Sequence, residues 1–301
     1  MSFLSLLLVL ASVEPDGALS EKLLPIYRAE AGEYSIAIES APNRPLELKK
    51  EPVFDWSNPT RVLGGQQGVV FLWLREGRPA ALGCIFSEPY PQLPGGRKIM
   101  HELHALDSEK LLIKRAGLNQ WKPEAGLSRT EIPGGGPPAD APGARLVQMR
   151  RLAQEFTGHS VDRDGKKWGL RLLPTPLYRY PTARTGVIDG ALFALVTNAG
   201  TDPEVLLLME AREEAGKTRW EYALGRFSDW ELHVQHKEKE VFASISSEAN
   251  TVPHDPKHTY RFYPDKIKTI DGKLLARQCS SRLGRRHGGA DNPVAGGLGG
   301  A

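Results

Sequence analysis

The feature that most constrains the fold of this 301-residue chain is an apparent internal duplication. Residues 46–56 resemble residues 170–180 at an offset of 124, with conservative matches at most apolar positions. At an offset of 122, a glycine followed by six apolar residues at 68–74 matches the same pattern at 190–196. Two similar units in tandem must either form two domains or bury their apolar faces against each other, and the sequence leaves both arrangements open.

Each unit is predicted to open with an amphipathic helix followed by strands. Apolar residues recur at three- and four-residue spacing between 146 and 156, and a weaker stripe runs from 23 to 34. Residues Tyr34, Ile36 and Ile38 alternate as in a strand, and the two glycine-led apolar runs suit strands covered on both faces. The predicted class is therefore α+β, with two tandem copies of an N-terminal helix followed by an antiparallel β-sheet. The two copies either share one pseudo-symmetric core or form separate domains.

The predicted organisation follows from composition along the chain. Glycine and proline dominate the segment before the second helix, which predicts a linker, and the C-terminal end is rich in Gly, Arg and Ser, which is typical of disorder. We therefore expect a signal peptide and leader at 1–19, a first unit at 20–121, a linker at 122–143, a second unit at 144–264 and a mostly disordered tail at 265–301.

An uncharged apolar run at 3–13 precedes Glu14 and has the length of a signal-peptide core, although no Lys or Arg precedes it. The run predicts a secreted or periplasmic protein. A strand or helix of the core remains the alternative, because the run is too short to distinguish the two. No later stretch approaches the ~20 apolar residues of a transmembrane span.

Net charge argues against nucleic acid as a partner. The segment 277–301 carries four arginines and one aspartate, which account for the whole net charge of +3, so the rest of the chain is neutral. A nucleic-acid surface needs several basic residues gathered on one face. The two cysteines, Cys84 and Cys279, are too few for a disulfide framework or a thiolate zinc site, and whether they pair is left open.

The sequence 99–106 contains His101, Glu102 and His104, which resemble metal ligands. A zincin helix needs H-E-x-x-H, and this segment is one residue short. If it is a strand, the two histidines point to opposite faces and cannot share a metal, whereas a helix would bring them together. A metal site at His101 and His104 is therefore a minor hypothesis, and we expect no cofactor.

Four aromatic residues alternate along predicted strands and could line a ligand groove: Phe54, Trp56, Tyr178 and Tyr180. Core packing is the more common role of such residues. The sequence lacks the usual motifs of a nucleophile triad or a phosphate-binding loop, so no catalytic residue is assigned.

The stretches 170–180, Asp189-Gly-Ala-Leu-Phe, Gly200-Thr-Asp-Pro-Glu and His101-Glu-Leu-His resemble a family of uncharacterised predicted secreted proteins from planctomycete bacteria. The resemblance covers most of residues 20–263. It implies export, and it implies no activity, cofactor or catalytic residue.

The leading functional hypothesis is a secreted or envelope-associated binding protein without enzymatic activity, whose partner is an envelope protein or a small apolar or glycan ligand. The alternative is a hydrolase that uses carboxylates or a histidine-containing metal site. An enzyme would bring at least two of five polar candidates together in a concave site: His101, His104, Asp189, Asp202 and Glu204.

Overall fold

The structure is a computed structural model that describes residues 16–59, 65–117, 120–124, 126–181, 186–245 and 258–277. The apolar run predicted as a signal, Cys279 and the tail beyond residue 277 lie outside these residues.

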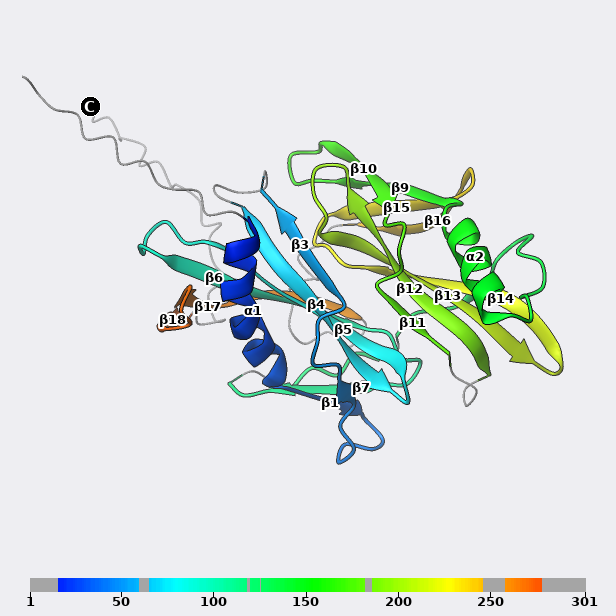
Figure 1. Cartoon of the computed structure of the whole chain (residues 1–301), viewed down its shortest axis with the longest axis horizontal. Helices are drawn as coiled ribbons and strands as arrows, with labels where there is room; N and C mark the ends of the chain where they lie inside the picture. The colour runs from blue at the N-terminus through cyan, green and yellow to red at the C-terminus, as the bar shows by residue number, and fades with distance from the viewer. Residues whose placement is uncertain are drawn as a thin grey trace, which may run out of the picture.

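The described chain forms two helices and three antiparallel sheets (Figure 1). The helices are α1 (Asp16–Gly32) and α2 (Pro142–Ala153). A small sheet pairs β1 (Tyr34–Ile38) with β7 (Leu111–Arg115). The first large sheet contains β2 (Glu47–Leu48), β3 (Phe54–Asn58), β4 (Gln66–Arg75), β5 (Arg78–Pro89), β6 (Gly96–Ala105), β17 (Tyr260–Thr269) and β18 (Leu274–Arg277). The second large sheet contains β8 (Thr130–Glu131), β9 (Phe156–Val161), β10 (Lys167–Leu172), β11 (Tyr178–Tyr180), β12 (Val187–Thr197), β13 (Pro203–Glu214), β14 (Lys217–Arg226), β15 (Glu231–His236) and β16 (Lys239–Ser244).

The predicted α+β class is wrong, because strands make up 53% and helices only 12% of the described residues. Strands, and not further helices, cover much of the apolar surface of the two large sheets. Ile36 of β1 and Ile113 of β7 pack with α1 over the outer face of the first sheet, and Phe156 of β9 packs with α2 on the second. The curled sheets therefore bury most of their own apolar surface.

The two glycine-led runs form β4 and β12, as strands buried on both faces. This confirms the prediction of strands covered on both faces, and each strand pairs with the following one in a hairpin. Their inner faces meet in one shared core, where Leu72 of β4 and Leu82 of β5 join Leu192 of β12 and Leu206 of β13. The fold is therefore a sandwich of two large sheets.

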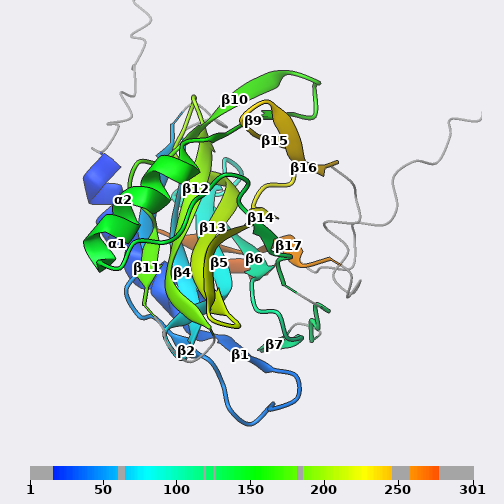
Figure 2. The same cartoon turned by 90° about the vertical axis from the view of Figure 1, so that its right-hand side faces the viewer.

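Helix α1 lies across β4 and β5 through the buried side chains Leu23, Tyr27 and Ala31, which are spaced one turn apart (Figure 1). The Tyr27 hydroxyl hydrogen-bonds Ser87 Oγ at 2.7 Å and donates to the Gln67 carbonyl oxygen at 2.9 Å. Helix α2 packs on the second sheet through Met149 and its neighbours, and in Figure 2 both helices lie at the left of the molecule.

The strands do not follow tandem unit boundaries. Strand β17 begins at residue 260, yet it pairs with β6 of the first sheet along most of its length. Strand β8, from the segment predicted as a linker, pairs with β14 of the second sheet. The boundary expected at 264 falls inside β17, and residues 274–277 form β18.

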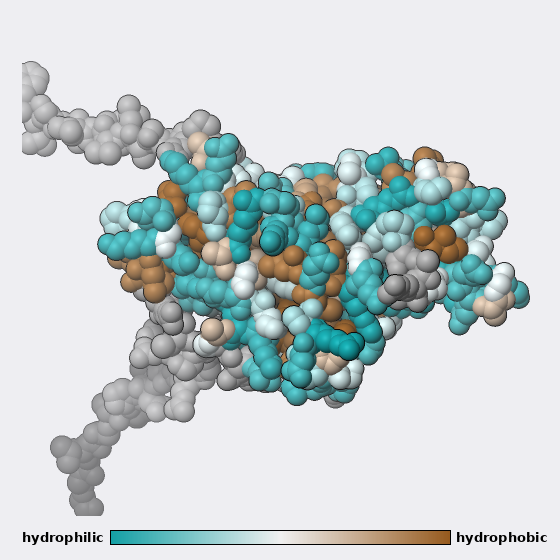
Figure 3. All heavy atoms as spheres, turned by 60° about the horizontal axis from the view of Figure 1, so that its bottom comes forward, coloured by the Kyte–Doolittle hydropathy of each residue, from teal (hydrophilic) through white to brown (hydrophobic). Residues whose placement is uncertain are grey.

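No helix in the described part of the chain is long and apolar enough to cross a membrane. The face shown in Figure 3 carries apolar surface near its centre, bordered by hydrophilic residues.

Candidate functional site

A cavity of about 350 Å³ opens between the two large sheets, at the end where β5 finishes and β13 begins. It is lined by Trp56, Gln66, Phe86, Glu88, Lys98, Met100, Glu102, Arg163, Asp202, Pro203, Phe227, Ser228, Asp229, Trp230 and Phe262. We call it the aromatic pocket. Its mixture of aromatic walls and a few polar groups is typical of small-ligand sites.

The first sheet supplies an aromatic wall built on a glycine. A Cβ atom at Gly68 would stand 2.7 Å from Trp56 Cε2 and 2.5 Å from Phe86 Cβ, so only glycine lets these side chains lie close against β4. The Trp56 and Phe86 rings are 5.5 Å apart, and Phe262 of β17 stacks on Phe86 at 6.2 Å. The Trp56 indole N–H points to Cys84 Sγ at 3.2 Å, which fixes the ring orientation.

The second sheet supplies the opposite wall from the turn between β14 and β15, which contains Phe227 and Trp230. The Arg226 guanidinium organises this turn, because it donates to the carbonyl oxygens of Ser228 at 3.0 Å and of Trp230 at 2.5 Å. The Trp230 ring stacks on Trp168 at 6.4 Å. The wall is therefore held by backbone contacts before any ligand arrives.

Among the polar groups of the pocket, the carboxyl group of Glu102 on β6 has the most strongly shifted pKa. Burial raises the pKa of its carboxyl well above the usual value, and the negative charges of Asp229, Glu204 and Asp202 raise it further. The Tyr260 hydroxyl donates to Glu102 Oε1 at 2.7 Å and partly opposes this shift. The raised pKa favours the protonated form of the Glu102 carboxyl, which can donate a hydrogen bond.

The other carboxylates of the pocket have polar partners. Asp229 Oδ2 accepts from Arg163 Nη2 at 2.7 Å, and Asp202 Oδ1 accepts from Asn58 Nδ2 at 3.2 Å. Glu88 lies 3.9 Å from the Lys98 ammonium group. These contacts fix the carboxylates, and because the Asn58 amide is uncharged, Asp202 leaves the pocket with a negative charge.

The four aromatic residues predicted to line a groove do not form one surface. Trp56 lines the aromatic pocket, and Phe54 packs beside the shared core. Tyr180 is buried, and its hydroxyl donates to Glu210 Oε1 at 2.9 Å. Tyr178 stacks on Tyr180 at 6.1 Å and donates to the Gly77 carbonyl oxygen. The two tyrosines therefore lie away from the pocket.

The histidines lie on opposite faces of β6. His101 packs on the α1 side, where its ring stacks on Tyr263 and its Nδ1 hydrogen-bonds the Tyr34 hydroxyl at 2.9 Å. His104 packs on the inner side, where its Nδ1–H donates to the Ala105 carbonyl oxygen at 2.7 Å. Because they face apart, they do not share a ligand.

His101 does belong to another group that has the ligand types for a metal. Its Nε2 lies 3.7 Å from both Glu30 Oε2 and Asp265 Oδ2. However, Arg115 Nη2 already contacts these two oxygens at 2.5 and 2.9 Å, and Lys266 Nζ lies 2.9 Å from Glu30. Two cationic side chains therefore neutralise the carboxylates, and the group forms an ion network that joins α1, β7 and β17.

Two further polar candidates are fully buried in the second sheet: Glu204 in β13 and Asp189 in β12, each with 0% exposure. Asp189 has two cationic partners. Arg145 Nε and Arg179 Nη2 donate to it at 3.0 and 2.7 Å, so its role is to anchor α2 and β11 to the sheet. Sequence reasoning missed Glu102, Asp229 and Trp230 as pocket residues. Glu102 was considered only as part of a metal motif, although its alternation with Met100 on β6 could have placed both on the inner face.

The fold and the pocket define a β-rich protein of two facing antiparallel sheets with an aromatic, carboxylate-bearing cavity at one end. No family model, curated protein or solved structure matches the chain.

Proposed function

We propose that the aromatic pocket binds a neutral, hydroxyl-rich ligand of the carbohydrate type. One observation carries this proposal: aromatic side chains from both sheets face a single cavity that also holds several carboxyl groups, among them Glu102, whose pKa is raised. Aromatic rings pack on the apolar faces of sugar rings, carboxylates accept hydrogen bonds from hydroxyl groups, and Glu102 can donate one.

The charge of the pocket supports a neutral ligand over an anion. Asp229 is paired with Arg163 and Glu88 lies near Lys98, whereas the Asp202 carboxylate accepts from the uncharged amide of Asn58. An anion would therefore meet the negative charge of Asp202. A molecule that exchanges hydrogen bonds without carrying charge avoids this repulsion.

Hydrolysis of a glycosidic bond is the second candidate, and the raised pKa of Glu102 favours it. A carboxyl group with a raised pKa near a second carboxyl group is the arrangement that glycoside hydrolases use. Glu102 would give its proton to the leaving oxygen as the C–O bond breaks. Water would supply the hydroxyl group to the sugar carbon, and Asp229 would accept the proton of that water.

Binding can be measured by tryptophan fluorescence, because Trp56 and Trp230 line the pocket. The full chain is titrated with neutral oligosaccharides of several linkages. We expect one class to give saturable quenching, and we expect Trp230→Ala to weaken binding at least about tenfold. Removing an aromatic side chain that stacks on a ligand ring costs ~1–3 kcal/mol of binding free energy where the ring is a nucleic-acid base.

Tyr178→Ala is the matched control, because it removes an aromatic side chain outside the pocket and should bind as the wild type does. Absence of saturable binding across the neutral panel, or equal weakening by both substitutions, would reject the proposal.

Glu102→Gln separates binding from hydrolysis. Glutamine retains a donor and an acceptor but cannot transfer a proton to a leaving group. If the wild type releases reducing ends from a bound oligosaccharide and Glu102→Gln binds it without turnover, the protein is a hydrolase. If the wild type binds without turnover, it is a binding protein.

We propose in addition that the protein acts outside the cytoplasm, as the apolar run at 3–13 and the resemblance to secreted planctomycete proteins suggest. Cell fractionation with N-terminal sequencing tests this. An exported chain that begins at Glu14 is expected, and a cytoplasmic chain that retains Met1 would contradict it.

A further inference from the structure

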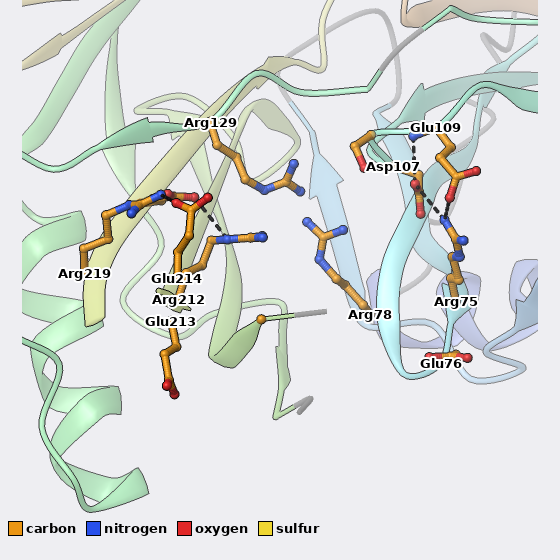
Figure 4. A pocket seen from close by; sticks show the side chains of 13 residues that line it. Arg75, Glu76, Arg78, Asp107, Glu109, Arg129, Arg212, Glu213, Glu214 and Arg219 are labelled. Atoms are coloured by element: carbon orange, nitrogen blue, oxygen red, sulfur yellow. Dashed lines mark hydrogen bonds and ion pairs between the residues drawn. The ribbon is translucent and has the colours of Figure 1, made fainter. Parts of the chain in front are cut away.

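A second cavity, of about 610 Å³, lies at the opposite end of β5 and β13 from the aromatic pocket (Figure 4). It opens between the hairpin that joins β4 to β5 and the hairpin that joins β13 to β14. Arginines line it from both sheets: Arg75, Arg78, Arg129, Arg212 and Arg219. We call it the arginine cavity.

Three of these arginines contact Glu210 of β13, which is 1% exposed and lies behind the lining of the cavity. Arg78 Nε donates to its Oε1 and Arg129 Nε to its Oε2, both at 2.8 Å. Arg212 Nη1 donates to Oε2 at 3.2 Å, and the Tyr180 hydroxyl donates to Oε1. Because Arg78 and Arg129 bind the two oxygens of one carboxylate, their guanidinium groups are held close together, and Figure 4 shows them facing each other across the cavity.

One carboxylate does not neutralise the guanidinium groups around it. Arg212 has a second anionic partner, Glu221, at 3.3 Å, but Arg78 and Arg129 share the single charge of Glu210. These two guanidinium groups therefore carry one more positive charge than Glu210 neutralises, although the cavity as a whole is lined by six acidic residues and five arginines. The side chain of Arg78 is only 8% exposed and that of Arg129 is 14% exposed, so water screens this excess weakly.

The same two arginines also have unused donors. Among the described residues, Nη2 of Arg78 and Nη2 of Arg129 are buried and have no hydrogen-bond partner. A buried charged donor without an acceptor is costly, so the two groups define a place where an acceptor belongs.

Most of the acidic residues that line the cavity pair with arginines other than Arg78 and Arg129. Arg75 pairs with Asp107 and Glu109, at 3.2 and 2.5 Å, and Arg219 pairs with Glu214 at 2.6 Å. Figure 4 shows Glu213 pointing away from the two facing guanidinium groups.

We propose that the arginine cavity binds an oxyanion, the carboxylate or phosphate group of a small ligand, between Arg78 and Arg129. A guanidinium group presents parallel N–H donors that match the two oxygens of a carboxylate or phosphate. The Glu210 carboxylate orients both forks, so the site is formed before the ligand binds. This site is separate from the aromatic pocket and does not depend on the function proposed for it.

The test is isothermal titration of the full chain with inorganic phosphate and with acetate, at an ionic strength held constant with sodium chloride. We expect saturable binding of at least one anion. Tighter phosphate binding identifies a phosphate group, tighter acetate binding identifies a carboxylate, and either result supports the site. Arg129→Gln should weaken binding at least about tenfold, a change of about 1.4 kcal/mol.

Arg28→Gln is the matched control, because it removes the same charge from the exposed pair with Glu51 on α1 and should leave binding unchanged. If Arg129→Gln does not fold, Arg129→Lys is tested instead. Lysine keeps the positive charge but lacks the paired N–H donors of the guanidinium group, so it should also weaken binding. The proposal is overturned if the wild type binds neither anion saturably. It is also overturned if the folded Arg129 variant and the Arg28 control bind with the same affinity.

Discussion

His104 should make the protein less stable in mild acid, and His104→Gln should remove part of that sensitivity. The imidazole is 1% exposed on the inner face of β6. Burial lowers its pKa from 6.5 to about 4, and the positive charge of Arg226 contributes in the same direction. The folded protein therefore holds His104 neutral at a pH where an unfolded chain would protonate it.

The direction and size of the effect follow from the pKa difference. Between pH 6.5 and pH 4 the unfolded chain binds more protons at this position, so the free energy of unfolding falls as the pH falls. A gap of about 2.5 pKa units corresponds to about 3 kcal/mol, of which about 2 kcal/mol is lost between pH 7 and pH 4.5. The pKa of His101 is also lowered to about 4, so the wild type should lose about twice that amount.

Urea unfolding at a series of pH values from 7 to 4.5, followed by tryptophan fluorescence, measures this dependence. His104→Gln should flatten the curve by about 2 kcal/mol over that range. His233→Gln is the contrasting control. Hydrogen bonds that the His233 ring donates to the Glu231 and Glu240 carboxylates raise the pKa of His233, so its stabilisation is present at low pH and is lost as the pH rises. Its removal should steepen the loss in acid. Parallel curves for the wild type and His104→Gln would refute the reasoning.

Three further predictions concern stability and reactivity. Asp189→Ala leaves two arginines without their buried partner, so it should lower the free energy of unfolding by about 3–5 kcal/mol in chemical denaturation, whereas Asp164→Ala at an exposed position should change it by less than ~0.5 kcal/mol. Gly190→Ala places a Cβ 2.4 Å from a buried tyrosine ring and should lower the melting temperature, while Gly143→Ala, with open space on α2, should raise it or leave it unchanged; the reverse order would contradict the packing. Burial raises the pKa of the Cys84 thiol well above its usual value, so in a Cys279→Ser background thiol reagents should label the protein only after unfolding, and rapid labelling of the native chain would disprove this burial.

Local pattern predicted the strands and helices better than it predicted their assembly. The apolar runs of β4 and β12 and the alternation of β1 are direct consequences of burial on two faces or one. The expected stripe from 146 to 156 became α2 as far as Ala153, and Phe156 instead begins β9. Helical spacing alone does not show where a helix ends, because an apolar residue just after it can serve the next strand equally well.

The fold class was mispredicted because the local sequence pattern does not show which element covers an apolar face. Periodicity shows that a face is apolar but not whether a helix or another strand covers it, and here β1, β7, β9 and β15 cover much of the outer faces. The pairing of β17 with β6 had no local signal, since the two strands are far apart in the chain.

The candidate site was predictable only in part. Trp56 could be named from strand alternation, and the strand assignment of 96–105 places Glu102 on the same inner face as Met100. Trp230 and Asp229 come from a turn of the second sheet, and only the packing of the two sheets brings them to the pocket. The raised pKa of Glu102 likewise depends on charges from both sheets, so no single segment contains the signal.

The pairing of β6 with β17 sets an order for biosynthesis. Glu102 and its partner Tyr260 are 158 residues apart, and β17 ends at Thr269. While the ribosome is still making the second sheet, the edge of β6 has no neighbour and offers unsatisfied backbone groups to any other nascent chain. Such distant contacts also form slowly. A chain that stops before β17 should therefore aggregate through β6 rather than survive as a folded N-terminal fragment, and it would lack the Tyr260 hydroxyl that contacts Glu102.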